Sequence, residues 1–287
     1  MRALPRSPAP DPDRIQRIQE FFAADPSVEH AADLTIEPRL QAKHGLPDAR
    51  VKGIELLVGL TDWTTGELVG AGEILKALAS SPRELLAARR HMTYRMLMSA
   101  PRCASYVAAA LGSHECPINV NVFPHLVGEQ GLVDTVRSVL QVSGLKPHRL
   151  TLEIMEHFRL KTLDPLQPLI DDGVRIALDD GGCKECGGME EMENRAHEVI
   201  LPGFTEVKLD QDIAGHPRLS HVIHRLLSSF DIHVTIEGVE TKGRLQTLQR
   251  ELADVGDRVS VQGYVHGAMQ RLPDFMASLR KGKRSGV

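Results

Sequence analysis

Eight β-type segments that alternate with helical segments are the feature that most constrains the fold of this 287-residue chain. The β-type segments lie at residues 34–38, 51–60, 117–122, 149–155, 174–179, 205–210, 232–237 and 258–263. Between them, apolar residues recur with helical spacing in four segments, at residues 82–98, 131–144, 218–230 and 243–252. This α/β alternation predicts a TIM-like (β/α)8 barrel, and an open doubly wound sheet is the alternative. The short connection 41–50 contains Gly and Pro and predicts a hairpin, so one antiparallel strand is expected near the start.

The two ends of the chain differ in composition from the region between them. Residues 1–12 are polar and rich in proline, and residues 14–24 then have helical spacing. We therefore expect a Pro-rich tail with an N-terminal helix over residues 1–31, a barrel domain over 32–280 and a basic tail over 281–287. With 42% hydrophobic residues, the chain can bury the core of one such barrel.

Charge and hydropathy argue against two classes of partner. Lys and Arg number 34 against 38 Asp and Glu, for a net charge of -4, so the chain has no overall positive field and no polymeric nucleic acid is expected as a partner. The sequence has no apolar run of signal-peptide or membrane-spanning length. No membrane partner is therefore expected, and the expected location is cytoplasmic.

Polar residues stand near the carboxyl end of successive β-type segments. They are Glu55, Asn121, Glu153, Asp179 with Asp180, Lys208, Glu237 and Gln262. In a parallel barrel the carboxyl ends of the strands form one mouth, so these side chains are expected to converge. Oxygen-rich sets of this kind suit hard divalent cations such as magnesium or manganese. Two adjacent aspartates further suggest two cations, with one carboxylate bridging them, as in sites that activate water for phosphodiester cleavage.

Seven short motifs carry a resemblance to a known family. They are "GIELL", "NVNV", "LTLEIME", "IALDDGG", "EVKLD", "TIEGVE" and "VQGYVHG". In this order the set resembles the EAL domain family, the bacterial cyclic di-GMP phosphodiesterase domains, over residues 32–280. The resemblance implies cyclic di-GMP as the ligand, hydrolysis of one of its phosphodiester bonds to give the linear dinucleotide, and two bound cations.

The resemblance also implies a role for each site residue. One cation would be held by Glu55, Asn121, Glu153 and Asp179, and the second by Asp179, Asp180 and Glu237. Lys208 and Glu237 would be catalytic. Lys208 would orient or polarise the attacking water, and both residues would activate it. Supporting roles are implied for three further residues: Gln262, Glu240 and, at the loop after the paired aspartates, Glu156.

The chain departs from the family pattern near the nucleotide. Gly59 stands where the family's E-A-L-x-R motif has an arginine that meets the ligand, and "IEP" replaces Tyr-Gln-Pro in the first strand. A lost charge-assisted contact costs about 1.5–3 kcal/mol of binding free energy unless another basic residue substitutes. Gly59→Arg is therefore expected to tighten ligand binding about tenfold, or by about 1.4 kcal/mol.

The loop after the paired aspartates is also unusual, and it reads "DDGGCKECGGMEEMENRAHEV" from Asp179. In the family this loop couples the site to a dimer interface, so a homodimer stays an open possibility. Its second half is either a short acidic helix on a rebuilt lid or an acidic solvated loop. Cys183 and Cys186 lack the second pair of ligands that a zinc knuckle needs. Two alternatives remain: a reversible disulfide whose formation moves the adjacent aspartates, or two reduced cysteines without a functional role.

Three functions fit these residues. The leading one is a metal-dependent cyclic di-GMP phosphodiesterase, because the residues that carry the chemistry are all present. An alternative is an EAL-like receptor or protein-interaction module with little turnover, which Gly59 and the altered loop favour. The third is a metal-dependent barrel enzyme that acts on a different phosphoester, which the same oxygen ring would also suit.

Overall fold

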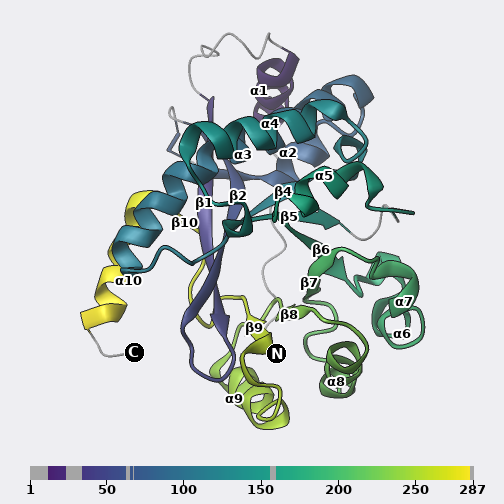
Figure 1. Cartoon of the computed structure of the whole chain (residues 1–287). Helices are drawn as coiled ribbons and strands as arrows, with labels where there is room; N and C mark the ends of the chain where they lie inside the picture. Colours follow the sequence, from purple (N-terminus) through teal and green to yellow (C-terminus); the bar gives the residue numbers. More distant parts are fainter. Residues whose placement is uncertain (1–11, 24–33, 63–64, 67, 156–159, 285–287) are drawn as a thin grey trace.

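The computed structural model describes residues 12–23, 34–62, 65–66, 68–155 and 160–284 of the chain, which form a barrel of strands with helices around it (Figure 1). The barrel strands are β1 (Leu34–Gly45), β2 (Val51–Asp62), β4 (Ile118–Val122), β5 (Leu150–Met155), β6 (Arg175–Gly181), β7 (Phe204–Leu209), β8 (His233–Ile236) and β9 (Val259–Val261). Two short strands, β3 (Leu68–Gly70) and β10 (Gln270–Arg271), extend the sheet beside β2 and β1.

The order of the strands closes the sheet on itself. Pairing runs from β2 through β4, β5, β6, β7, β8 and β9, and β1 then pairs with both β9 and β2. The barrel strands β2 and β4 to β9 are parallel, whereas β1 is antiparallel to its neighbours. The predicted TIM-like barrel with one antiparallel strand near the start is confirmed, and the open sheet is wrong.

Helices surround the barrel and supply the outer layer of the core. They are α1 (Pro12–Ala23), α2 (Ala71–Ala77), α3 (Pro82–Leu111), α4 (Gln130–Ser143), α5 (Gln167–Asp171), α6 (Gly188–Asn194), α7 (Ala196–Val199), α8 (Leu219–Ser229), α9 (Lys242–Glu251) and α10 (Leu272–Arg284). Short 3-10 helices lie at Pro124–Leu126, Pro147–Arg149, Asp164–Leu166, Lys184–Cys186 and Gly256–Arg258. Each described helix is too short or too polar to cross a lipid bilayer.

The two-residue period of the strands separates the core from the site. On β2, the side chains of Ile54, Leu56 and Leu60 are fully buried in the hydrophobic core. Glu55 lies between two of them and therefore points to the opposite face, into the barrel. The same alternation on the other strands gives a barrel with an apolar outer wall and a polar interior.

The ends of the chain and strand β2 refine two expectations. Helix α1 contacts α2 and α3 and buries Ile18 and Phe22 in the common core, while residues 1–11 lie outside the described part. Helix α10 ends at Arg284, so the start of the expected basic tail is helical. Glu55 is not at the end of its strand, because β2 continues to Asp62 in a long antiparallel hairpin with β1.

Candidate metal centre

The ammonium group of Lys208 lies at the centre of the barrel mouth. It projects from β7 and is 1% exposed. Its Nζ lies 2.7 Å from Asp179, 2.9 Å from Glu237 and 3.2 Å from both Glu55 and Glu153. Burial alone would lower the pKa of Lys208, but these four acids raise it well above its ordinary value. Lys208 is therefore a permanent positive charge at neutral pH.

Parallel strand pairing brings the other predicted residues to the same level. Asn121 on β4 lies opposite Glu153 on β5, and its Nδ2 donates a 2.8 Å hydrogen bond to Oε1 of Glu55. Gln262, directly after β9, donates a 2.6 Å hydrogen bond from Nε2 to Oε2 of Glu55. Glu55 thus accepts hydrogen bonds from residues on either side of the β1–β2 hairpin, and these bonds hold its carboxylate in the mouth.

A β-bulge places Asp179 and Asp180 in one site. Adjacent side chains of a regular strand point to opposite faces, but the pairing of β6 with β7 shifts register between Leu178 and Gly181. Asp180 has a φ of 58°, in the left-handed region that non-glycine residues rarely adopt. The next residue is close-packed, since a Cβ on Gly181 would lie 3.0 Å from the backbone oxygen of Lys208. The bulge explains how two adjacent acids share one mouth.

The acids form two groups with the geometry of metal ligands. In each group, one oxygen per residue lies within 4.8 Å of the others: Glu55, Glu153 and Asp179 in the first, and Asp179, Asp180 and Glu237 in the second. Asp179 belongs to both groups. The carboxylates around Lys208 outnumber their ammonium partners, and oxygen donors of this kind suit hard divalent cations. The residues present therefore fit two cations that share one carboxylate.

The pKa values report the excess of negative charge. Burial first, and neighbouring carboxylates second, raise the pKa to about 7 at Glu55, Asp179, Asp180 and Glu237. Glu153 differs, because Lys208 and Lys43 outweigh its burial and lower its pKa to about 2. Without a cation, the mouth therefore holds protons on some of its acids at neutral pH.

A second polar layer beneath the mouth was not predicted from the sequence. Lys43 on β1 pairs with Glu153 at 2.9 Å and with Glu206 at 2.7 Å. Asn119 donates a 2.8 Å hydrogen bond to Glu153, and Thr235 donates a 2.6 Å bond to Glu206. Each of Asn119 and Glu206 lies two residues before a predicted site residue on its strand. The two-residue period was the signal that could have identified them.

One predicted supporting residue lies on the surface. Glu240 is exposed, and its supporting role stays a prediction. Glu156 lies outside the described residues.

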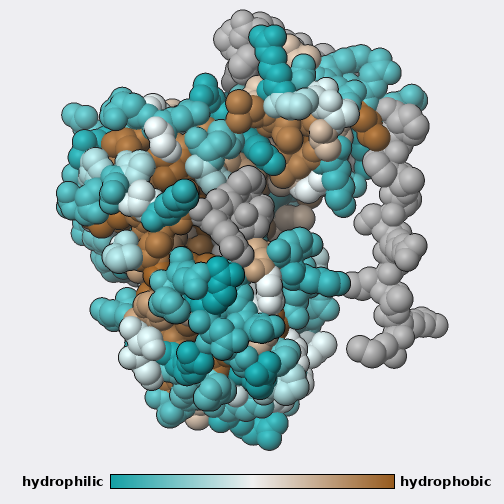
Figure 2. Space-filling view, turned by 90° about the vertical axis from the view of Figure 1, so that its right-hand side faces the viewer, coloured by the Kyte–Doolittle hydropathy of each residue, from teal (hydrophilic) through white to brown (hydrophobic). Residues whose placement is uncertain are grey.

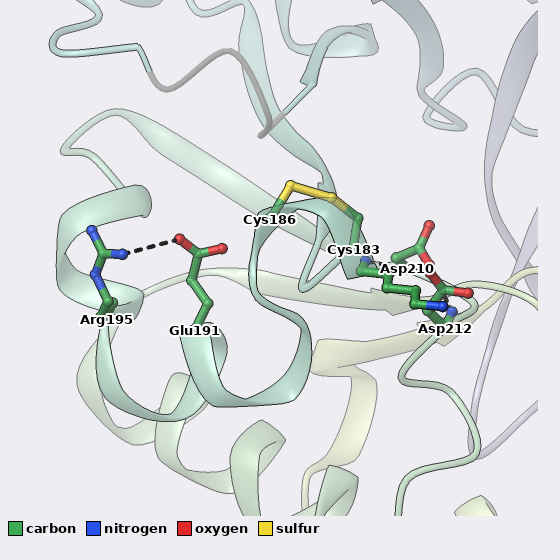
Figure 3. The surroundings of a disulfide bond; sticks show 7 residues. Cys183, Cys186, Glu191, Arg195, Asp210 and Asp212 are labelled. Atoms are coloured by element: carbon green, nitrogen blue, oxygen red, sulfur yellow. Dashed lines mark hydrogen bonds and ion pairs between the residues drawn. A yellow bond between two sulfur atoms is a disulfide. The ribbon is translucent and has the colours of Figure 1, made fainter.

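The unusual loop contains a disulfide and two short helices. Cys183 and Cys186 form a disulfide (Figure 3). The backbone N–H of Cys183 donates a 2.9 Å hydrogen bond to the carbonyl of Asp180. The acidic segment is not a solvated loop, because it forms α6 and α7. Glu191 and Glu193 are buried, with Arg195 at 3.8 Å from the first and Arg218 at 2.7 Å from the second. Of the two alternatives, the short acidic helix is correct and the solvated loop is wrong.

A cavity of about 350 Å³, with a mainly apolar lining, lies where α7 meets the outer side of β5 and β6. Ile154, Leu178, Val199 and Phe204 contribute to its wall. On the face of the molecule that Figure 2 shows, patches of hydrophobic surface are visible among the hydrophilic surface.

Comparison with known proteins defines the class to which this barrel belongs. The sequence model of the EAL domain matches residues 28–266. An uncharacterized signaling protein of Caulobacter vibrioides is 34% identical over 52% of this chain and 18% of its own length. The bifunctional diguanylate cyclase/cyclic di-GMP phosphodiesterase MucR of Pseudomonas aeruginosa is 28% identical over 58% of this chain and 24% of its length. The chain thus spans about a fifth to a quarter of these relatives.

Solved structures share the fold. The EAL enzyme Bd1971, in its cAMP and cyclic-di-GMP bound form, matches with a TM-score of 0.70 at 17% identity, over 93% of this chain and 69% of that one. This likeness concerns the fold alone, whereas the sequence match covers all the predicted site residues, from Glu55 to Gln262. The chain belongs to the EAL domain family.

We predict that manganese stabilises the protein more at pH 8 than at pH 5.5. Four acids of the mouth have a raised pKa of about 7, so the folded protein retains protons that the unfolded chain releases above about pH 4. The free energy of unfolding of the metal-free protein therefore falls as pH rises from about 4 to 7. A cation binds the ionised acids and offsets this loss. At 100 times Kd, the melting temperature should rise by about 5–10 °C at pH 8.

Differential scanning fluorimetry with and without manganese at the two pH values measures this difference. Calcium serves as a second hard cation that should show the same trend. An equal rise in melting temperature at both pH values would contradict the assignment of the acids to the cation sites.

The disulfide is expected to affect cation affinity. The backbone N–H of Cys183 donates a hydrogen bond to the carbonyl of Asp180. Reduction of the Cys183–Cys186 disulfide should therefore loosen the backbone next to the bulge that orients the Asp180 side chain. Dithiothreitol should weaken manganese binding severalfold in calorimetry. The variant Cys183→Ser/Cys186→Ser should bind as weakly as the reduced protein and should not respond to dithiothreitol. An unchanged manganese affinity of the parent protein after reduction would rule out this coupling.

Proposed function

We propose that this chain is a metal-dependent phosphodiesterase that hydrolyses cyclic di-GMP to the linear dinucleotide. The observation that carries the proposal is that two clusters of three acids lie around the buried Lys208 and have Asp179 in common. Membership of the EAL family and the relative named as a cyclic di-GMP phosphodiesterase support the choice of substrate.

Magnesium or manganese ions at the two groups would lower the pKa of a water molecule and neutralise charge on the phosphodiester. The first group with Asn121 would hold one ion, and Asp179, Asp180 and Glu237 the other. Within this chain, Lys208 supplies a fixed positive charge where negative charge develops on the phosphate oxygens. Gln262 and Asn121 hold the Glu55 carboxylate in place through their hydrogen bonds.

Glu237 is the acid best placed to move a proton. Its side chain is 20% exposed, against 9% or less for the other acids that contact Lys208. It therefore faces the open side of the mouth, where the substrate enters. Glu237 would accept a proton from the attacking water as the water oxygen bonds to phosphorus. The bond from phosphorus to the ribose 3′ oxygen breaks, and that oxygen takes up a proton to complete the linear product.

A receptor that binds cyclic di-GMP with little turnover is the second candidate. The observation that favours it is Gly59, which removes the arginine of the family motif from β2. Loss of a ligand contact changes affinity and leaves the cluster around Lys208 intact. The two candidates therefore differ in turnover.

Glu237→Gln is expected to abolish hydrolysis and to retain most of the affinity for cyclic di-GMP. The amide keeps the shape of the side chain, but it supplies neither the negative charge nor the proton acceptor. A loss of turnover by at least about 100-fold is expected from removal of a general base. Nucleotide chromatography with manganese measures turnover, and calorimetry with calcium measures binding.

Glu251→Gln, at an exposed position on α9, is the matched control and should leave turnover unchanged. If the parent protein binds cyclic di-GMP but does not cleave it over many hours with manganese, the receptor replaces the phosphodiesterase. If it neither binds nor cleaves, a different phosphoester or a protein partner replaces both.

A further inference from the structure

The space beside Gly59 is filled by an arginine from the neighbouring strand. A Cβ built on Gly59 would lie 2.8 Å from Nε and 2.9 Å from Cγ of Arg39, and 2.7 Å from Cδ1 of Leu68. Real side chains do not approach so closely, so Gly59 allows the Arg39 side chain to cross it. Arg39 belongs to β1, whereas the family motif places its arginine on β2.

Strand register places Arg39 on the inner face of the hairpin, just above the site. Gln41 lies opposite Glu55, Arg39 opposite Leu57 and Glu37 opposite Gly59. Because side chains alternate, Arg39 and Gln41 share the face of Glu55, and they are about 7 Å apart along the strand. Gln41 accepts a 3.1 Å hydrogen bond from Gln262, which itself contacts Glu55. Arg39 therefore lies at the rim of the same mouth.

The Arg39 guanidinium is buried, and its hydrogen bonding is incomplete. The residue is 5% exposed; its Nη2 donates to Thr61 Oγ1 at 2.9 Å and lies 3.4 Å from Glu37. Its Nε has no acceptor within the described part of the chain. A buried donor without a partner costs free energy, which an acceptor oxygen would recover.

A second arginine adds positive charge at this rim. Arg271 lies opposite Arg39 in the pairing of β10 with β1, and its Nε is 3.7 Å from Glu37. The Arg39 guanidinium is also within electrostatic reach of the Asp274 carboxylate. Two guanidinium groups thus lie side by side at this rim, and together they can bind an anion although the metal centre below them is acidic.

We propose that Arg39 binds a phosphate group of the nucleotide substrate at the rim of the mouth. Arg39 takes the place of the arginine that Gly59 removes, and Arg271 adds positive charge beside it. The inference rests on the proposed function, because it assumes a phosphodiester ligand over the metal centre. It corrects the expectation for Gly59→Arg, since a second arginine would collide with the first instead of adding a contact.

Calorimetry with cyclic di-GMP and calcium tests the inference through a double-mutant cycle. Arg39→Met keeps the aliphatic stem and removes the charge, and it should weaken binding about tenfold or more, a change of about 1.4 kcal/mol. Gly59→Arg alone should not tighten binding. The double variant Arg39→Met/Gly59→Arg frees the space and should recover most of the lost affinity. Arg50→Met, in the exposed turn at the other end of the same hairpin, should bind like the parent.

Each outcome has a separate meaning. Recovery in the double variant supports a phosphate contact, because a purely structural role of Arg39 would not be replaced from the other strand. If Arg39→Met binds like the parent, or if the double variant binds no better than Arg39→Met, the inference is overturned and the phosphodiesterase proposal stands. If the parent itself does not bind cyclic di-GMP, the proposed function fails and the inference fails with it.

Discussion

The ion contacts of Lys208 are the interaction on which the rest of the structure depends. One ammonium group, fully enclosed by the barrel, contacts four carboxylates. Buried carboxylates without partners would be too costly to retain, but one positive charge cannot neutralise them all. The raised pKa values of the acids are the result of this imbalance. Divalent cations at the two carboxylate groups would therefore stabilise the barrel, and under the proposed function the same charge distribution would stabilise a phosphodiester as it is cleaved.

The departures from the family pattern affect different parts of the site. The bulge at Asp180 and the ion pairs around Lys208 keep the acids of the candidate metal centre in one mouth. Above that centre, the basic group near the mouth lies on β1 as Arg39, where the family pattern has it on β2. The rebuilt loop changes the outside of the barrel and adds the disulfide beside the bulge. The departures therefore lie at the rim and on the outside of the barrel, while the residues proposed to perform the reaction stay in place.

The sequence predicted the fold and the main members of the site because both depend on local period. Apolar alternation marked the eight strands, and polar side chains at their ends marked the mouth. The left-handed φ of Asp180 could not be predicted, because it depends on the register between β6 and β7. The positions of Lys43 and Arg39 could not be predicted either, because both lie on the antiparallel strand β1. The contact of Arg39 with Gly59 joins two neighbouring strands and depends on their register. Helix formation in the acidic loop depends on buried partners such as Arg218.

The central claim is that Asp179 is shared by two cations. Anomalous diffraction from a crystal soaked in manganese chloride tests this claim most directly, because it locates manganese without reference to activity. The account predicts two peaks in the barrel mouth, about 3.5–4 Å apart, with the carboxylate of Asp179 between them. A mouth without manganese, or a single ion that does not contact Asp179, would contradict it.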